Sequence, residues 1–497
     1  METRIFKPGE IKFVYVLHLL LLPSFFVFHG YVDFFGVIFF RNVMQMLAQY
    51  LLATAILLTI FFVFFKNFSK ASILTFFVMA YHFFFGSLQD EGKKILGQSF
   101  LTRYSFILTF SFILFILLII LIKRSHSSFY KLHLLLSVLF TLFIAIDLTI
   151  FTIKIYNSRN KKSVMNELGF VRCDTCGKPD TYFIVLDGYA GQNELINTLG
   201  FDNSAFENDL KNKGFRVIKN SKGNYNSTPF SLASTLNMSC LKVSGRFENR
   251  NDLITSLRMI NKNEVADFFS LEGYQIKSYS LFNFNNIETK ASDFTLFEVR
   301  SNAIYNQTFL SRVKRDIGFY LVKKFHLQSE INKTALATLS YNNATYNSLI
   351  KETNSQQQQP RFIYAHLIMP HWPYYYSENG KLQPTNKLLL FGDPDSRAYI
   401  EYLEYCNKKI NFLIDQIFLG SKKKAIIMLI GDHGFREFTK PVDPKYLFYN
   451  LSSVYLPGQN YATFYDGMSN VNLFRSLLNV QFNQSLPRLQ DSTVLIK

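Results

Sequence analysis

Four residues that follow the apolar first part of the chain have types and positions that suit metal-dependent chemistry. Asp187 directly follows the apolar run 182–186 (YFIVL), and Asp432 with His433 follows the run 425–430 (AIIMLI). Ligands of parallel α/β sheets bind at the carboxyl ends of strands. A single Asp-Gly at a strand end is usually a turn, but Gly-Asp-His-Gly offers oxygen and nitrogen ligands on adjacent residues. This pattern predicts a zinc or manganese site.

A hydroxyl group forms the fourth element of the pattern. Thr228 stands in the segment NYNSTPFSLAS, and Pro229 suits the first position of a helix, so Thr228 is the expected N-cap. The positive field of a helix N-terminus also favours a phosphoryl group. Alone, this segment predicts only a helix cap. Its position between the upstream Asp187 and the downstream Asp432-His433 favours a functional role.

The elements that must position these residues have the pattern of an α/β domain. The runs 182–186, 362–365 and 425–430 are short, apolar and continuous, which is typical of strands buried on both faces of a largely parallel sheet. The stretch 397–419 is expected to be a helix. Its apolar residues at helical spacing are Ile400, Leu403, Ile410, Leu413, Ile414 and Ile417.

The first part of the chain is far more apolar than the second. Five stretches approach the roughly 20 residues that a membrane-spanning helix needs: 12–29, 45–65, 71–87, 104–122 and 131–154. The first is interpreted as a span rather than a cleaved signal peptide, because no small-residue cleavage site follows it. We therefore expect a transmembrane helical domain at 1–155, a juxtamembrane linker at 156–180 and a catalytic domain at 181–497.

The distribution of basic residues predicts the orientation of the spans. The side assigned to the cytoplasm carries Arg4, Lys7, Lys12, Lys66, Lys70, Lys123, Arg124 and Lys131. Five crossings then place the catalytic domain on the periplasmic or extracellular side of the inner (cytoplasmic) membrane. Asp147, inside the fifth span, is an ionisable group within the membrane and thus a functional candidate, although it could equally lie near the outer interface.

The net charge bears on the binding partners of the protein, and the cysteines bear on its disulfides and metal sites. The net charge of +17 suits anionic lipid headgroups or phosphorylated substrates, and it equally suits simple solubility of a Lys-rich chain. No basic–aromatic module indicates a nucleic-acid partner. Cys173 and Cys176 form a CxxC that is more typical of a small disulfide outside the membrane than of a zinc knuckle.

Four motifs together resemble a known family. VLDGY, NYNSTPFSLAS, MPHWPYY and GDHG occur in this order over most of 180–440 and resemble the sulfatase-like branch of the alkaline phosphatase superfamily. The plan looks most like membrane-anchored phosphoethanolamine transferases and lipoteichoic acid synthases, which also place five transmembrane helices before an external catalytic domain. The tail, with YLPG at 455–458 and NLFR at 472–475, looks like bacterial members. The resemblance implies an alkaline phosphatase-like α/β sandwich with a largely parallel central sheet.

The resemblance also implies roles for individual residues. Asp187, Asp432 and His433 match metal ligands, and Thr228 matches the nucleophile, which the metal also contacts. His371, in the motif PHWPY, resembles the histidine that contacts the substrate phosphoryl group. One divalent metal ion is expected, with zinc favoured and manganese possible.

The implied activity is transfer of a phosphoalcohol headgroup, phosphoethanolamine or phosphoglycerol, from a membrane phospholipid donor. The headgroup would pass through a phospho-threonine to an envelope glycan or lipid acceptor outside the membrane. A membrane-tethered phosphodiesterase or sulfatase-type hydrolase with the same site is the alternative. An inactive scaffold is a third reading, against which the joint presence of Asp187, Thr228, Asp432 and His433 argues.

Two departures from related families limit these alternatives. True sulfatases carry C/S-x-P-x-R, whereas this chain has Thr228-Pro-Phe-Ser-Leu, which disfavours sulfate ester hydrolysis. Two-metal phosphatases need a further Asp-His-His set, and no third partner accompanies His366 and His371. His366 could equally be structural. Arg436 could bind a substrate anion or form a surface ion pair.

Overall fold

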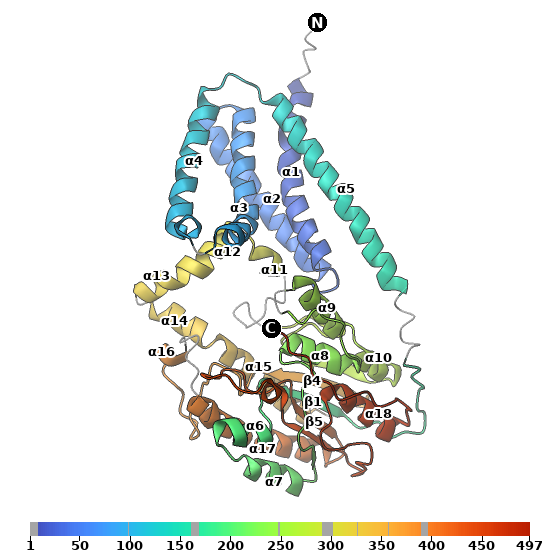
Figure 1. Ribbon diagram of the computed structural model, residues 1–497. Coiled ribbons are helices and arrows are strands. Elements are labelled where there is room, and N and C mark those ends of the chain that lie inside the picture. The colour runs from blue at the N-terminus through green and yellow to red at the C-terminus, as the bar shows by residue number, and fades with distance from the viewer. Residues whose placement is uncertain are drawn as a thin grey trace. The chain divides into compact units, whose positions relative to one another are not determined.

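The computed structural model describes residues 8–97, 99–160, 168–246, 249–290, 302–325, 327–355, 357–388 and 396–497, and Figure 1 shows its elements. The chain divides into two compact units. The helical unit comprises Met1–Lys161 and Glu298–Leu327, and the catalytic unit comprises Lys162–Phe297 and Gln328–Lys497. Each unit is described separately below.

The helical unit contains five helices that are long and apolar enough to cross a membrane. They are α1 (Pro8–Asp33), α2 (Phe40–Phe65), α3 (Phe68–Leu96), α4 (Tyr104–Arg124) and α5 (Tyr130–Asn160). The prediction of five apolar helices at the start of the chain is confirmed. Helix α5 continues to Asn160, so the first residues of the expected linker at 156–180 are helical.

Polar side chains inside this bundle contact one another across helices. Asp147 on α5, the ionisable residue noted in the sequence, lies 3.1 Å from Nδ1 of His29 on α1. Ser69 on α3 lies 2.9 Å from Nε2 of His133 on α5. Such pairing is typical of polar groups within membrane bundles, because hydrocarbon offers them no other partner.

A second part of the chain also belongs to the helical unit. It contains α11 (Asn302–Tyr305), α12 (Phe309–Val313), the π-helical turn η3 (Lys314–Gly318) and α13 (Phe319–Lys324). The domain limits predicted from the sequence include these residues in the catalytic domain, 181–497. Here they group with the membrane helices, and the limits 1–155, 156–180 and 181–497 stay predictions.

The catalytic unit is built on a six-stranded sheet in the order β2-β6-β5-β1-β4-β3. The strands are β1 (Thr181–Leu186), β2 (Arg216–Val217), β3 (Gln275–Tyr279), β4 (Arg361–Leu367), β5 (Ile426–Gly431) and β6 (Ser452–Tyr455). Strands β5, β1, β4 and β3 run parallel, whereas β6 is antiparallel to β5 and β2 is antiparallel to β6. The expected α/β fold with a largely parallel sheet is confirmed.

Helices cover both faces of this sheet. Figure 1 shows α8, α10 and α18 on one face and α15 and α17 on the other. The helices of the unit are α6 (Gln192–Leu199), α7 (Ser204–Asn212), α8 (Thr228–Asn237), α9 (Arg250–Asn261), α10 (Glu264–Leu271), α14 (Gln328–Ala335), α15 (Ala337–Thr353), α16 (Thr385–Leu388), α17 (Ser396–Ser421) and α18 (Leu473–Phe482). Aromatic contacts fill the first face: Phe183 packs on Phe474, and Phe269 packs on Phe362.

The strand register aligns the ends of the central strands. Leu186, the last residue of β1, pairs with Gly431, the last residue of β5. The next residues, Asp187 and Asp432, are therefore neighbours at the carboxyl edge of the sheet. On the other side of β1, Val185 pairs with His366 of β4, which brings a histidine to the same edge.

The two cysteines before β1 form a bond with each other. Cys173 and Cys176 are joined as a disulfide, which confirms the interpretation of the CxxC as a small disulfide rather than a zinc knuckle.

Candidate metal centre

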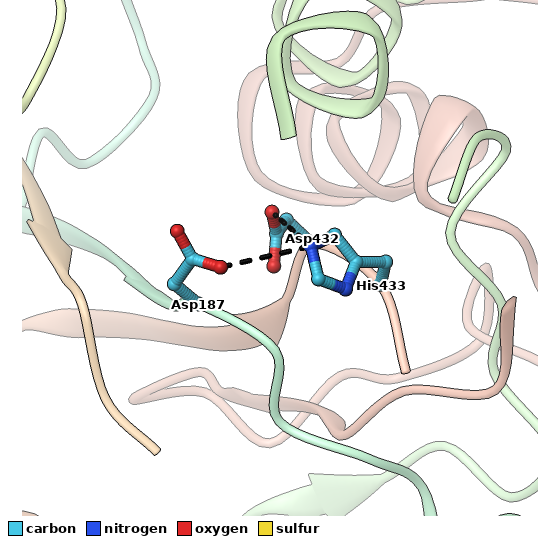
Figure 2. Close-up of side chains that lie close together, drawn as sticks. All are labelled: Asp187, Asp432 and His433. Carbon is cyan, nitrogen blue, oxygen red and sulfur yellow. Dashed lines mark ion pairs between the residues drawn. The ribbon is translucent and has the colours of Figure 1, made fainter. Parts of the chain in front are cut away.

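Three hydrogen-bond acceptors converge at the carboxyl edge of the sheet. Nε2 of His433 lies 3.6 Å from Oδ1 of Asp187 and 3.4 Å from Oδ2 of Asp432. Figure 2 shows both carboxylates turned toward the imidazole. All three side chains are fully buried, and their ligand atoms lie within 4.8 Å of one another. The structure therefore brings together three of the four residues that the sequence predicted as metal ligands.

The tautomer of His433 follows from its other ring nitrogen. Nδ1 lies 2.7 Å from the carbonyl oxygen of Gly434. Because a carbonyl only accepts, Nδ1 carries the hydrogen and Nε2 carries the lone pair in the neutral ring. Burial, with a smaller effect from the charge of Arg436, lowers the pKa of His433. The ring is thus neutral at neutral pH, with a lone pair directed at the two carboxylates.

The outward atoms of the two carboxylates are held by other groups, whereas the inward atoms are not. Oδ2 of Asp187 lies 3.2 Å from Nε2 of His366, and Oδ1 of Asp432 accepts a 3.0 Å hydrogen bond from the amide of Gly188. Among the described residues, Oδ1 of Asp187 and Oδ2 of Asp432 have no hydrogen-bond partner. Two buried carboxylate oxygens that lie close together without a donor repel unless a cation lies between them. The donor set therefore fits a divalent metal ion.

Histidines also control the charge of Asp187. Burial on its own raises the pKa of this carboxyl group, but the imidazoles of His371, His366 and His433 outweigh that effect and hold it below its usual range. Asp187 is therefore ionised at neutral pH, as a metal ligand must be.

Thr228 lies beside this cluster at the start of α8. Its Oγ1 is 3.3 Å from Nε2 of His433, and its side chain is buried. The helix begins at Thr228 itself, and Ser227 is the N-cap, one residue earlier than the sequence suggested. The hydroxyl group of Thr228 is therefore free of capping and lies in the first turn, where amide groups favour a bound anion.

Contacts at both ends of α8 fix the position of Thr228. Ser231, three residues on, donates a 2.6 Å hydrogen bond to the carbonyl oxygen of Asp432, which joins the helix to the end of β5. At the other end, the guanidinium of Arg475 donates to the carbonyl oxygen of Met238 at 2.7 and 2.9 Å. A cation there also suits the negative end of the helix. The NLFR segment of the tail thus supports α8.

His371 and Arg436 form a polar pair close to the cluster. The His371 ring centroid lies 6.5 Å from that of His433, and Nδ1 of His371 donates to the carbonyl oxygen of Trp372 at 2.7 Å. The Arg436 guanidinium reaches Nε2 of His371 at 3.4 Å and donates to the carbonyl oxygen of Asn226 at 2.8 Å. No carboxylate pairs with Arg436 in the described parts of the chain. It thus does not form the surface ion pair considered from sequence.

Other residues at this edge carried no clear signal in the sequence. His366, left open between a structural and a functional role, is buried and orients Asp187. Tyr341 on α15 donates to the carbonyl oxygen of His366 at 2.8 Å, and Asn342 holds both backbone groups of Ile368. Both helix residues stand in a stretch where the sequence showed no motif. The signal that could have found His366 is its position one residue before the end of the strand.

Glu194 on α6 leads to a stability prediction. It is fully buried beneath the Gly-Asp-His-Gly turn, and burial raises its pKa well above the usual value of 4.5. The folded protein therefore holds this proton to a higher pH than the unfolded chain does, so the cost of burial grows as the pH rises above 4.5. Glu194→Gln is expected to raise the free energy of unfolding at pH 8 and to have a smaller effect at pH 4.

Thermal unfolding in detergent across a pH series measures this effect. The gain from Glu194→Gln should shrink toward zero near pH 4, while the exposed Glu378→Gln should show no pH-dependent gain. A gain that stayed constant across the series would contradict the protonated form of Glu194.

Comparison with known proteins identifies the family. The family model for sulfatases matches residues 218–476, more than half of the chain, so the chain belongs to the sulfatase family. The expectation of a sulfatase-like member of the alkaline phosphatase superfamily is confirmed. Because this domain accompanies five helices of membrane-spanning length, the protein is a membrane-anchored enzyme of the sulfatase family. No curated protein matches the chain.

The solved structures that match this chain are distant in sequence. The integral membrane lipooligosaccharide phosphoethanolamine transferase A of Neisseria meningitidis is 12% identical, over 96% of this chain and 95% of that one, with a TM-score of 0.37. The zinc complex of the periplasmic domain of EcEptC from Escherichia coli is 12% identical over 66% and 89%, with a TM-score of 0.38. A putative sulfatase from Bacteroides thetaiotaomicron is 13% identical over 64% and 74%, with a TM-score of 0.38. Likenesses at this level do not assign a substrate.

Proposed function

We propose that the protein is a transferase that moves a phosphoalcohol headgroup, phosphoethanolamine or phosphoglycerol, from a membrane phospholipid to a glycan or lipid acceptor outside the membrane. The observation that carries the proposal is the hydroxyl group of Thr228, 3.3 Å from Nε2 of His433 and beside the unpaired oxygens of Asp187 and Asp432. The chain joins this site to five helices of membrane-spanning length, which suits a lipid donor.

The reaction divides into two substitutions at phosphorus. In the first, Oγ1 of Thr228 forms a bond to phosphorus, the bond from phosphorus to the glyceride oxygen breaks, and the threonine proton passes to that oxygen. In the second, an acceptor hydroxyl group forms a bond to the same phosphorus, the bond from phosphorus to Oγ1 of Thr228 breaks, and the acceptor proton passes to Oγ1. The covalent phospho-threonine thus separates one difficult transfer into two easier steps.

The residues of the site would share these tasks. Asp187, Asp432, His433 and Thr228 would hold a divalent cation, with zinc favoured and manganese possible, and such an ion would supply Lewis-acid chemistry to the threonine hydroxyl and to a phosphoryl oxygen. His366 orients Asp187 through the 3.2 Å contact. The amide groups in the first turn of α8 favour the negative charge of the phosphoryl group.

His371 and Arg436 would bind the phosphoryl oxygens and steady the charge that develops during transfer. The guanidinium of Arg436 is fixed by the carbonyl oxygen of Asn226, two residues before Thr228, and no carboxylate among the described residues neutralises it. A guanidinium held in this way suits a phosphodiester. The sulfatase motif C/S-x-P-x-R is replaced here by Thr-Pro-Phe-Ser-Leu, which favours phosphoryl over sulfuryl transfer.

Replacing Arg436 tests its assigned role. Arg436→Gln is expected to lower kcat/KM for the lipid donor about 10- to 100-fold, because a charge-assisted hydrogen bond to the phosphoryl group is lost. Metal content and melting temperature should not change, and Arg436→Lys should recover part of the activity. Steady-state kinetics with the exposed Arg397→Gln as the control measures the effect. An Arg436→Gln enzyme with unchanged kcat/KM would contradict the role.

The direct test of the function is a search for the covalent intermediate. The protein is purified from membranes in detergent and digested, and the peptide that contains Thr228 is examined by mass spectrometry beside the Thr228→Ala variant. An adduct with the mass of phosphoethanolamine or phosphoglycerol on Thr228 is expected, and it would identify the donor class.

The other outcomes favour the competing activities. An unmodified Thr228 in a metal-loaded protein that releases free headgroup to water would indicate the phosphodiesterase or sulfatase-type hydrolase. A protein with neither adduct nor metal would indicate an inactive scaffold.

A further inference from the structure

The segment 302–325 interrupts the catalytic unit in the chain but packs on the helical unit. It leaves the catalytic unit after β3 and returns to it at α14; α12 lies at the end of α3, and α11 lies beside α1 (Figure 1). Neither its length nor its composition predicts a membrane span. Side-chain contacts, rather than a membrane span, must therefore hold the segment on the bundle.

Polar contacts fix the segment at one level of the bundle. Arg312 forms two hydrogen bonds with the carboxylate of Asp90, at 2.8 and 2.6 Å, and is itself buried. Asp316 accepts a 2.6 Å hydrogen bond from the hydroxyl group of Tyr104. Asp90 stands where α3 changes from the apolar FFFG to the charged DEGKK, and Tyr104 begins α4. That change marks the boundary between hydrocarbon and water.

Apolar contacts extend from the same segment into the bundle. The ring of Phe309 lies 5.3 Å from that of Tyr81 and 5.0 Å from that of Phe85, both on α3 before Asp90. Gly86 donates its amide hydrogen to the carbonyl oxygen of Gln307 at 2.8 Å, and a side chain at Gly86 would collide with that oxygen. The segment is therefore seated on α3 rather than loosely attached to it.

The outward face of the segment is apolar and basic. Leu310, Tyr320, Leu321 and Phe325 are 58%, 61%, 42% and 65% exposed. Lys314 and Lys324 are exposed among them. Further exposed apolar residues stand at the end of α3, Ile95 and Leu96, and in the connection to α4, Phe100 and Leu101.

We propose that the segment 302–325 lies in the outer interface of the bilayer, with Leu310, Tyr320, Leu321 and Phe325 inserted at the boundary between headgroups and acyl chains. The partner is a lipid surface that contains anionic headgroups. Three features select it: the segment is fixed at the hydrocarbon boundary of α3, its exposed face is apolar as the exposed sides of the spans are, and its lysines complement phosphate groups. Aromatic and basic residues together are typical of this interface.

Site-directed spin labelling of the full-length protein tests the proposal. The exposed Cys240 is first replaced by serine, whereas the buried Cys406 and the Cys173–Cys176 disulfide are kept. Phe325→Cys and Leu310→Cys are labelled separately and placed in vesicles of phosphatidylethanolamine and phosphatidylglycerol. Lys381→Cys, at an exposed position of the catalytic unit, is the control.

The relative accessibility of each label to oxygen and to a water-soluble nickel chelate reports its depth. Labels at 325 and 310 should lie about 5–10 Å below the headgroup phosphates, and the label at 381 should remain accessible to the chelate. Labels at both 325 and 310 as accessible to the chelate as the one at 381 would overturn the proposal. Labels shielded from both reagents, and exposed again when the protein is diluted into excess lipid, would indicate a second copy of the chain and would also overturn it.

Discussion

Thr228→Ala is expected to reduce headgroup transfer by at least about 10³-fold, because the attacking oxygen is lost. The fold should change little: Ser227, not Thr228, is the N-cap of α8, so no helix cap is removed. The lost hydroxyl contact with His433 should cost no more than about 1 kcal/mol in the free energy of unfolding. Transfer of a labelled headgroup to an acceptor lipid, measured in detergent, gives the rate.

Two further variants distinguish the loss of the Thr228 oxygen from a general disturbance of α8. Thr228→Ser keeps an oxygen at the same position and should retain measurable transfer. Thr235→Val removes a hydroxyl group from the same helix, where it bonds only to the backbone of Ser231, and should leave the rate nearly unchanged. Equal losses in Thr228→Ala and Thr235→Val would show that α8 is merely disturbed and that Thr228 is not the nucleophile.

Asp432→Asn is expected to remove the bound metal and, with it, the activity. The asparagine oxygen can still accept the hydrogen bond from the amide of Gly188, but the second, unpaired oxygen and the negative charge are lost. Metal affinity should fall by more than the roughly 10- to 100-fold that follows loss of an outer contact. Elemental analysis by mass spectrometry gives the metal content per chain.

The melting temperature provides a second measurement of Asp432→Asn. Added zinc should stabilise the wild-type protein by mass action but not the variant. In the metal-free state the variant should melt higher than the wild type, because one of two facing buried carboxylates has become neutral. Asp443→Asn, an exposed carboxylate paired with Lys445, is the control and should respond to zinc as the wild type does. An Asp432→Asn protein with its full metal content would exclude Asp432 as a ligand.

The sequence predicted those parts of the fold in which burial is complete. Strands β1, β4 and β5 are buried along their whole length, so β1 and β5 are continuous apolar runs that end at Asp187 and Gly431, and β4 contains the apolar run 362–365. The edge strand β3 (QIKSY) is partly exposed, and β2 has two residues, so neither leaves a recognisable pattern. The five spans were equally clear, because hydrocarbon requires long uninterrupted apolar helices.

The candidate site was predictable where its residues belong to local motifs. Asp187, Asp432 and His433 follow apolar runs, and the strand register then brings them together without further information. Other contacts depend on residues far apart in the chain. Arg312 meets Asp90 across 222 positions, and Tyr341 reaches the backbone of His366 from another element. A single sequence gives no signal for such pairs, so the attachment of the segment 302–325 to the membrane helices was not foreseen.

The path of the chain between its two units has a practical consequence. The polypeptide passes from one unit to the other at 161–162, at 297–298 and again at 327–328. A protease that cuts only the connector after α5 would therefore not release the catalytic unit, which would remain joined to the bundle through Arg312 and its neighbours. A truncated protein that starts after α5 would carry Phe309 and Phe325 without their bundle, and it would tend to aggregate. A soluble version of the enzyme requires that 298–327 be excised and the two ends rejoined by a short linker.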